Sequence, residues 1–161
     1  MATQYGRTVG RWHNVIVSDS AGTLRAIPVT SINGVGLNYP EADVTALQDA
    51  LKGVLPDTPD CAITISGPVD NSAAAVAPAL SGSHTVLSAI NGAQTPLSLD
   101  IQLGIRHAWE SGEPQFGITK SATSGFLCTS YIIDPASMTY TARFGMFPGS
   151  SAPAWGTAAE S

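Results

Sequence analysis

The residues of this sequence that could do chemistry are scattered rather than clustered. Its three histidines, His13, His84 and His107, have no neighbouring ligands of the kind that a metal site needs. The H-E-x-x-H, C-x-x-C and G-x-S-x-G patterns of zinc, redox and hydrolase sites do not occur in the sequence. Glu110 and Glu113 lie close together, but in a segment with glycine and proline where exposure to solvent is their ordinary explanation. We therefore expect no enzyme activity, no catalytic residue, no metal and no other cofactor.

Two glycines separated by one residue, Gly34 and Gly36, give the closest match to a phosphate-binding loop in this sequence. Gly34 and Gly36 follow an apolar run, but the third glycine of a dinucleotide-binding loop is missing. The residues that come next, 37–40, end in proline and do not open a helix. We expect both glycines to adopt a positive φ in a turn, the conformation that glycine accepts most readily.

The two cysteines are expected to be structural. Cys61 and Cys128 each lie in an apolar run that is typical of a strand. Residues 1–10 are polar and lack the apolar segment of an export signal, which favours residence in the cytoplasm. In a reducing compartment, a buried free thiol is the better interpretation than a disulfide.

Composition and charge reduce the number of function classes that fit this sequence. The 161 residues are enough for one domain with its own core, and only 12% of them are charged, about half of the usual share. An unusually uncharged surface favours contact with a partner. The net charge of −5 and the dispersed basic residues argue against binding to nucleic-acid phosphates. The longest stretch of small apolar residues, 73–80, is too short to cross a membrane.

Strand patterns dominate the chain. Alternating or continuous apolar runs bounded by turn residues predict strands at 12–17, 24–27, 29–35, 61–67, 97–105, 115–119, 126–133 and 138–146. The first two of these strands are separated by the turn-forming segment 18–22, which predicts a hairpin. The spacing of the later strands favours a sandwich or a barrel.

Two helices are expected between the strands. The apolar residues that recur at helical spacing in the first are Val44, Leu47, Leu51 and Val54. Asp43 or Thr45 could cap the start of this amphipathic helix, and Pro56 would stop it. The second, over part of 84–90, follows an alanine- and serine-rich stretch and has weaker helix signals.

The chain shows no internal repeat and no change of composition that would indicate a second domain. We expect one β domain over 1–147, and its first ten residues, 1–10, are expected to form a polar N-terminal arm. Residues 148–161 are small and polar and are expected to form an extended C-terminal tail. Trp155 in this tail is either a packing anchor or has no structural role.

Several short signals follow one another in a fixed order between residues 10 and 71. They are an acidic residue before Val-Thr, a predicted helix, a Leu-Pro turn and a strand that ends in Ser-Gly and an aspartate. The residues at these places are Asp43, Val44, Thr45, Leu55, Pro56, Ser66, Gly67 and Asp70. In this order they resemble the major tail tube proteins of long-tailed bacteriophages, with Asp57 in place of the usual glycine of that family.

The resemblance implies a fold, an assembly and a location. The fold would be mainly β, a sandwich or barrel of antiparallel strands flanked by one short helix. Copies of the chain would close into hexameric rings, and the rings would stack into a virion tail tube, assembled in the host cytoplasm, through which DNA passes without specific binding. Tail terminators, type VI secretion tubes and other virion proteins, such as capsid decoration, minor capsid or collar proteins, remain alternatives because one fold serves many functions.

Three segments are candidates for contact between rings, and each is equally well interpreted as a plain surface loop. They are the N-terminal arm, the proline loop 37–42 and the glycine-containing loop 107–115. The candidate interface residues in the two loops are Leu37, Asn38, Tyr39, Pro40, Glu110 and Glu113. A competing hypothesis is a small hydrolase or carbohydrate-binding module, for which the sequence offers only the separate Trp12, Trp109 and Trp155 and ordinary carboxylates.

Overall fold

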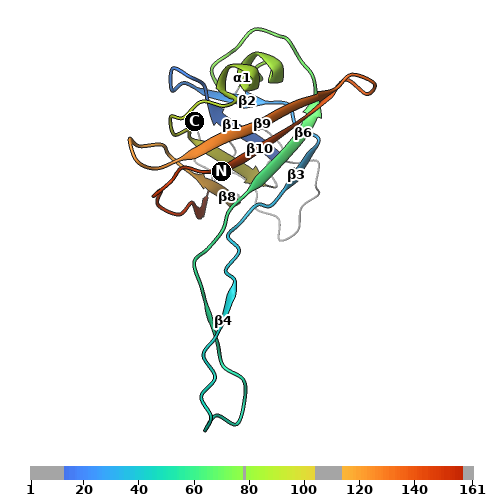
Figure 1. Ribbon diagram of the computed structural model, residues 1–161. Coiled ribbons are helices and arrows are strands. Elements are labelled where there is room, and N and C mark those ends of the chain that lie inside the picture. The colour runs from blue at the N-terminus through green and yellow to red at the C-terminus, as the bar shows by residue number, and fades with distance from the viewer. Residues whose placement is uncertain (1–12, 78, 104–113, 158–161) are drawn as a thin grey trace.

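The chain folds into two facing β-sheets, one short helix and a long two-stranded projection (Figure 1). The computed structural model describes residues 13–77, 79–103 and 114–157. All pairings between the strands of these sheets are antiparallel. The prediction of a mainly β fold with a flanking helix is therefore confirmed.

The first sheet has five strands in the order β11-β8-β7-β1-β2. Their bounds are β1 (His13–Ser18), β2 (Leu24–Ile27), β7 (Leu99–Leu103), β8 (Pro114–Ile118) and β11 (Ala154–Thr157). The predicted hairpin of β1 and β2 is present, and its turn is built around the Asp19 carboxylate. Asp19 accepts hydrogen bonds from the backbone of Ala21 and Thr23 and pairs with Arg25 at 2.9 Å.

The second sheet has four strands in the order β3-β6-β10-β9. Their bounds are β3 (Ser31–Asn33), β6 (Ile63–Pro68), β9 (Phe126–Asp134) and β10 (Thr139–Met146). In β6 and β10 every second residue is buried over most of the strand, as their alternating sequences predict.

One hydrophobic core lies between the two sheets. It includes Val15 and Ile101 from the first sheet and Ile65 and Phe144 from the second. The buried Tyr140 ring is part of this core, and its hydroxyl donates to the carbonyl oxygen of Pro28 at 2.7 Å. The described strands do not close into a barrel, so of the two predicted arrangements the sandwich is the one present.

The helix α1 (Ser83–Ile90) covers one end of the core. It buries Val86, Leu87 and Ile90 and lies against β9 and β2. The prediction of a helix over part of 84–90 is confirmed. Apolar burial on one face stabilises this helix despite its modest intrinsic propensity.

The other predicted helix, over 43–54, is wrong. This segment instead forms β4 (Glu41–Asp43), the turn that follows it, and the start of β5 (Val54–Pro56). An isolated helix of this length is marginal in water unless its apolar stripe packs against something. The segment extends away from the domain (Figure 1), so the described part of the chain offers no surface for that stripe.

The glycine and cysteine predictions are confirmed. Gly34 and Gly36 have φ values of 83° and 128°. An added Cβ at Gly34 would lie 2.2 Å from the backbone oxygen of Ala62, so only glycine fits there. Cys61 and Cys128 are both free and buried.

The C-terminal segment contains a strand that the sequence does not indicate. β11 pairs with β8 from Ala154↔Gly117 to Thr157↔Pro114. The Trp155 ring lies 5.0 Å from the buried Phe116 ring, centroid to centroid, and is 53% exposed. Trp155 is thus a packing anchor, because it attaches this segment to the edge of the first sheet.

Candidate assembly interface

The most prominent surface feature of the molecule is a long hairpin, residues 38–60, which we call the arm. At its base Asn38 and Asp60 exchange two backbone hydrogen bonds, of 2.9 and 2.8 Å. Further out, the Asp57 N–H donates to the carbonyl oxygen of Pro40 at 2.7 Å, and β4 and β5 then pair with each other. In Figure 1 the arm extends away from the body.

The distal end of the arm is held by side-chain hydrogen bonds. The Thr45 hydroxyl accepts from the Gly53 N–H at 2.8 Å and lies 2.7 Å from the Asp43 carboxylate. The Thr45 hydroxyl and the Thr45 backbone N–H both donate to the exposed Asp43 carboxylate, and these two hydrogen bonds lower its pKa. Asp49 closes the tip by accepting the Ala46 N–H at 2.8 Å. Asp43 and Thr45 therefore hold a hairpin rather than cap a helix.

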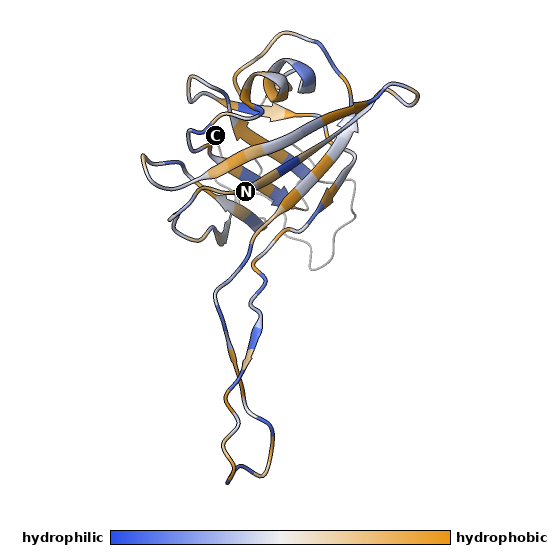
Figure 2. Cartoon of the chain, viewed as in Figure 1, coloured by the Kyte–Doolittle hydropathy of each residue, from blue (hydrophilic) through white to orange (hydrophobic). Residues whose placement is uncertain are grey.

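Apolar side chains on the arm face solvent. Leu47 and Leu51 at the tip are 102% and 84% exposed, and Val44 and Leu55 nearer the body are 50% and 57% exposed. Figure 2 shows apolar stretches interspersed with polar ones along the arm. A two-stranded hairpin of this kind is only marginally stable by itself, and exposed leucines add no stability. The arm thus has the properties of a segment whose apolar side chains are buried only when a partner binds.

The tail-tube motif residues do not form one cluster. Asp43, Val44, Thr45, Leu55 and Pro56 all lie in the arm, with Pro56 opposite Glu41. Of the other three motif residues, Ser66 and Gly67 lie in β6 and Asp70 follows that strand, all on the body.

Each of those three has a structural explanation. Ser66 and Gly67 pair with β10, and an added Cβ on Gly67 would come 2.8 Å from the carbonyl oxygen of Pro28. The Asp70 carboxylate accepts hydrogen bonds from the backbone and hydroxyl of Ser72, which lower its pKa.

The predicted ring contacts in loop 37–42 lie at the root of the arm. Asn38 and Pro40 take part in its backbone pairing, and Tyr39 is 47% exposed. Leu37 is partly buried against the core and also lines a pocket. Glu110 and Glu113 lie outside the described residues, as do segment 1–10, His107, Trp12 and Trp109.

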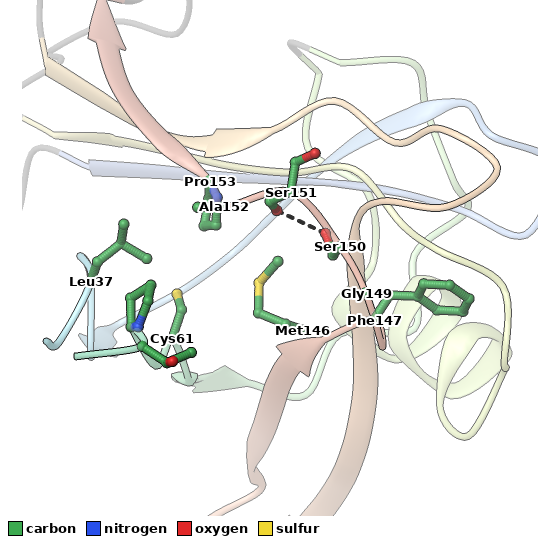
Figure 3. Close-up of a pocket in the computed structure, with 11 residues that line it drawn as sticks. Leu37, Cys61, Met146, Phe147, Gly149, Ser150, Ser151, Ala152 and Pro153 are labelled. Carbon is green, nitrogen blue, oxygen red and sulfur yellow. Dashed lines mark hydrogen bonds between the residues drawn. The ribbon is translucent and has the colours of Figure 1, made fainter. Parts of the chain in front are cut away.

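The pocket beside the root of the arm has a volume of about 320 Å³ and is mostly apolar. Figure 3 shows Leu37 and Cys61 from the arm side and Met146, Ala152 and Pro153 from the C-terminal side. We call it the root pocket. Burial raises the pKa of the Cys61 thiol, with a smaller contribution from the nearby Asp60. Sequence patterns do not reveal this pocket, because the two sides come from segments that are far apart in the chain.

A row of polar side chains crosses the outer face of the first sheet. The Gln102 amide donates to Gln115 at 3.0 Å, and Gln115 in turn lies 3.4 Å from an oxygen of Asp100. Burial raises the pKa of the Asp100 carboxyl to about 6. Gln102 is fully buried, so this polar row has limited contact with solvent.

The described histidines have structural contacts. A ring nitrogen of His13 lies 3.2 Å from the carbonyl oxygen of Val29, and one of His84 lies 3.0 Å from the Tyr131 hydroxyl. Among the described residues, no group of three histidine, cysteine or acidic side chains is arranged to hold a metal ion. Within the same part of the chain, no helix has the length and apolar character needed to cross a membrane.

Comparisons with known proteins agree with this fold. No protein-family model matches the sequence, and no curated protein does. Among solved structures, the tube-terminating cap of the anti-feeding prophage is similar over 98% of this chain and 95% of that chain, with a TM-score of 0.57 and 17% identity.

Two structures of an extracellular contractile injection system, PVC, are similar as well. Its sheath/tube terminator in the extended state matches over 96% of this chain and 99% of that chain, with a TM-score of 0.55 and 15% identity. A chain of its extended sheath–tube complex matches over 94% of this chain and 92% of that chain, with a TM-score of 0.55 and 13% identity. The chain therefore has a tail-tube-like fold.

Proposed function

We propose that this protein is a structural subunit of a phage-tail-like particle and forms a ring that ends or caps its tube. The observation that carries this proposal is the arm, whose exposed leucines extend from a domain with a tail-tube-like fold. A monomer gains nothing from such a projection, whereas a closed ring or a stack of rings gives it a partner. Two of the similar structures are a tube-terminating cap and a sheath/tube terminator.

The proposed role is structural rather than enzymatic. The described histidines contact a backbone carbonyl oxygen and a tyrosine hydroxyl, and no group of three described histidine, cysteine or acidic side chains could hold a metal ion. The partners of the protein would be copies of itself and the other structural proteins of the particle. Its place would be the tail, where assembly proceeds from subunits made in the cytoplasm.

A second candidate is a tube subunit that forms stacked hexameric rings. The similarity to a chain of a sheath–tube complex favours it, as does the order of motif residues from Asp43 to Asp70. In this role the net charge of −5 would help DNA pass through the lumen without binding.

The two candidates differ in whether assembly stops. We would measure the mass of the full-length protein by light scattering over a wide concentration range and image the same samples by negative-stain electron microscopy. Rings of one stoichiometry that do not lengthen as concentration rises are expected for a cap or terminator. Open-ended tubes would instead establish the tube subunit. A protein that stays monomeric at every concentration would overturn both candidates.

A further inference from the structure

The tip of the arm presents two leucines that no other described part of the chain covers. Leu47 and Leu51 have exposed fractions of 102% and 84%. The nearby acidic groups are held inside the turn, because Asp49 accepts the Ala46 N–H at 2.8 Å and Asp43 is bonded to Thr45. The tip therefore offers two apolar side chains beside acidic groups that already have hydrogen-bond partners.

The root pocket offers a matching apolar surface. The lining residues that the structure describes include Leu37, Cys61, Met146 and Pro153 and no charged side chain. Hydrogen bonds hold its C-terminal wall in place, since the Ser150 hydroxyl accepts the Gly125 N–H at 3.0 Å and the Ser124 hydroxyl accepts the Ser151 N–H at 3.0 Å. A wall fixed in this way lowers the entropy cost of binding.

The tip and the root pocket of one chain cannot meet. Leu51 at the tip is seven residues from Thr58, the first pocket residue on that side of the arm, a span of about 23 Å at roughly 3.3 Å per residue of extended chain. The arm is paired from Asn38↔Asp60 outwards and extends away from the body, so the tip does not fold back (Figure 1). Any docking between the two surfaces has to join two copies.

We propose that the arm tip of one copy, through Leu47 and Leu51, docks in the root pocket of the next copy. This inference rests on the proposed function, because it names the contact through which copies of this chain would assemble. The two surfaces are different, so the contact is head-to-tail, and repetition around an axis closes a ring if the rotation between copies permits. The next copy is the favoured occupant because the complementary apolar surface occurs on this same chain.

Two variants test the contact from its two sides. The double variant Leu47→Asp/Leu51→Asp removes the apolar tip, and Ala152→Trp fills the pocket from an exposed position on its wall. We expect each to raise the dissociation constant for self-association at least about 30-fold, as loss of a central contact does. Matched controls are Ile132→Asp, at a residue 66% exposed on β9, and Ala136→Trp in the exposed turn before β10. Both controls should assemble as the unmodified protein does.

Mixing the two variants gives the sharper result. The tip variant keeps an intact pocket and the pocket variant keeps an intact tip, so an equimolar mixture should form heterodimers that grow no further. Analytical ultracentrifugation of each variant and of the mixture measures this, and melting temperatures equal to that of the unmodified protein show that the variants are folded.

The outcomes separate this inference from the proposed function. An unmodified protein that never assembles contradicts the proposed function itself. An unmodified protein that forms rings, together with variants that assemble equally well, overturns only the docking of tip in pocket. Variants that fail to assemble and also fail to pair on mixing would overturn it too, because the contact would then not be head-to-tail. If docking of the tip is overturned, the remaining occupants of the root pocket are a small apolar ligand or a different protein.

Discussion

Asp70 and Ser83 join the end of β6 to the start of α1 through backbone and hydroxyl groups. The buried Ser83 hydroxyl accepts the Asp70 N–H at 3.0 Å and donates to the carbonyl oxygen of Pro68 at 2.8 Å. In return, the His84 N–H donates to the Asp70 carbonyl oxygen at 2.9 Å. A residue of the motif that carries the family resemblance thus positions the helix that closes the core.

Replacement of Ser83 by alanine should destabilise the domain. It leaves the Asp70 N–H and the Pro68 carbonyl without their buried partner, and an unsatisfied buried group costs about 1–3 kcal/mol. Ser88→Ala is the matched control, because Ser88 is exposed on the same helix and bonds only to the helix backbone of His84. Urea unfolding measures both, and equal free energies of unfolding for the two variants would contradict the assignment.

Stability should depend on pH through Asp100. Burial raises the pKa of its carboxyl from 3.8 to about 6, so the folded state holds this proton more tightly than the unfolded chain does. The associated stability is fully present below pH 4 and is lost as pH rises through about 6. At about 1.4 kcal/mol per pH unit, the loss is up to about 3 kcal/mol.

The variant Asp100→Asn removes this titration. Its free energy of unfolding should match that of the unmodified protein below pH 4 and exceed it above pH 7, where the buried carboxylate is charged. Urea unfolding between pH 3.5 and 8 measures the difference. An Asp100→Asn variant whose stability follows the same pH curve as the unmodified protein would show that another group is responsible.

Trp155 should anchor β11 to the first sheet. Its ring packs on Phe116 at a centroid distance of 5.0 Å, and the strand pairs with β8. Because Trp155 is half exposed, we expect Trp155→Ala to cost about 1–2 kcal/mol, less than truncation of a fully buried tryptophan. Limited proteolysis should then cut near the C-terminus faster than in Trp155→Phe. Equal cleavage rates would indicate that the backbone pairing alone holds the strand.

The arm should be preorganised by Thr45. The variant Thr45→Val keeps the shape of the side chain but loses the hydroxyl that bonds to Gly53 and Asp43. The melting temperature of the body should stay unchanged, while the dissociation constant for self-association should rise about 5- to 10-fold because a looser arm loses more entropy on docking. Thr141→Val is the control, because Thr141 is exposed on β10 and belongs neither to the arm nor to the lining of the root pocket. A fall in melting temperature without a change in association would contradict this role.

Most of the secondary structure can be predicted from local patterns in the sequence. Alternation in β6 and β10 matches the burial of every second residue, and the turn at Asp19 ends β1 as predicted. Gly34 illustrates why turns can be predicted from a sequence. Its φ is positive, and few residue types other than glycine adopt that conformation readily. Such features depend on a few neighbouring residues, so the sequence by itself determined them.

The arm, β11 and the root pocket were decided by the tertiary structure. The helical spacing from Val44 to Val54 specifies a helix only when a surface is available to bury its apolar stripe, and here the segment lies beyond the body. β11 exists because β8 has a free edge, and the root pocket exists because 146–153 passes beside Leu37 and Cys61. These features depend on how segments far apart in the chain are placed relative to one another, and local sequence patterns do not predict that placement.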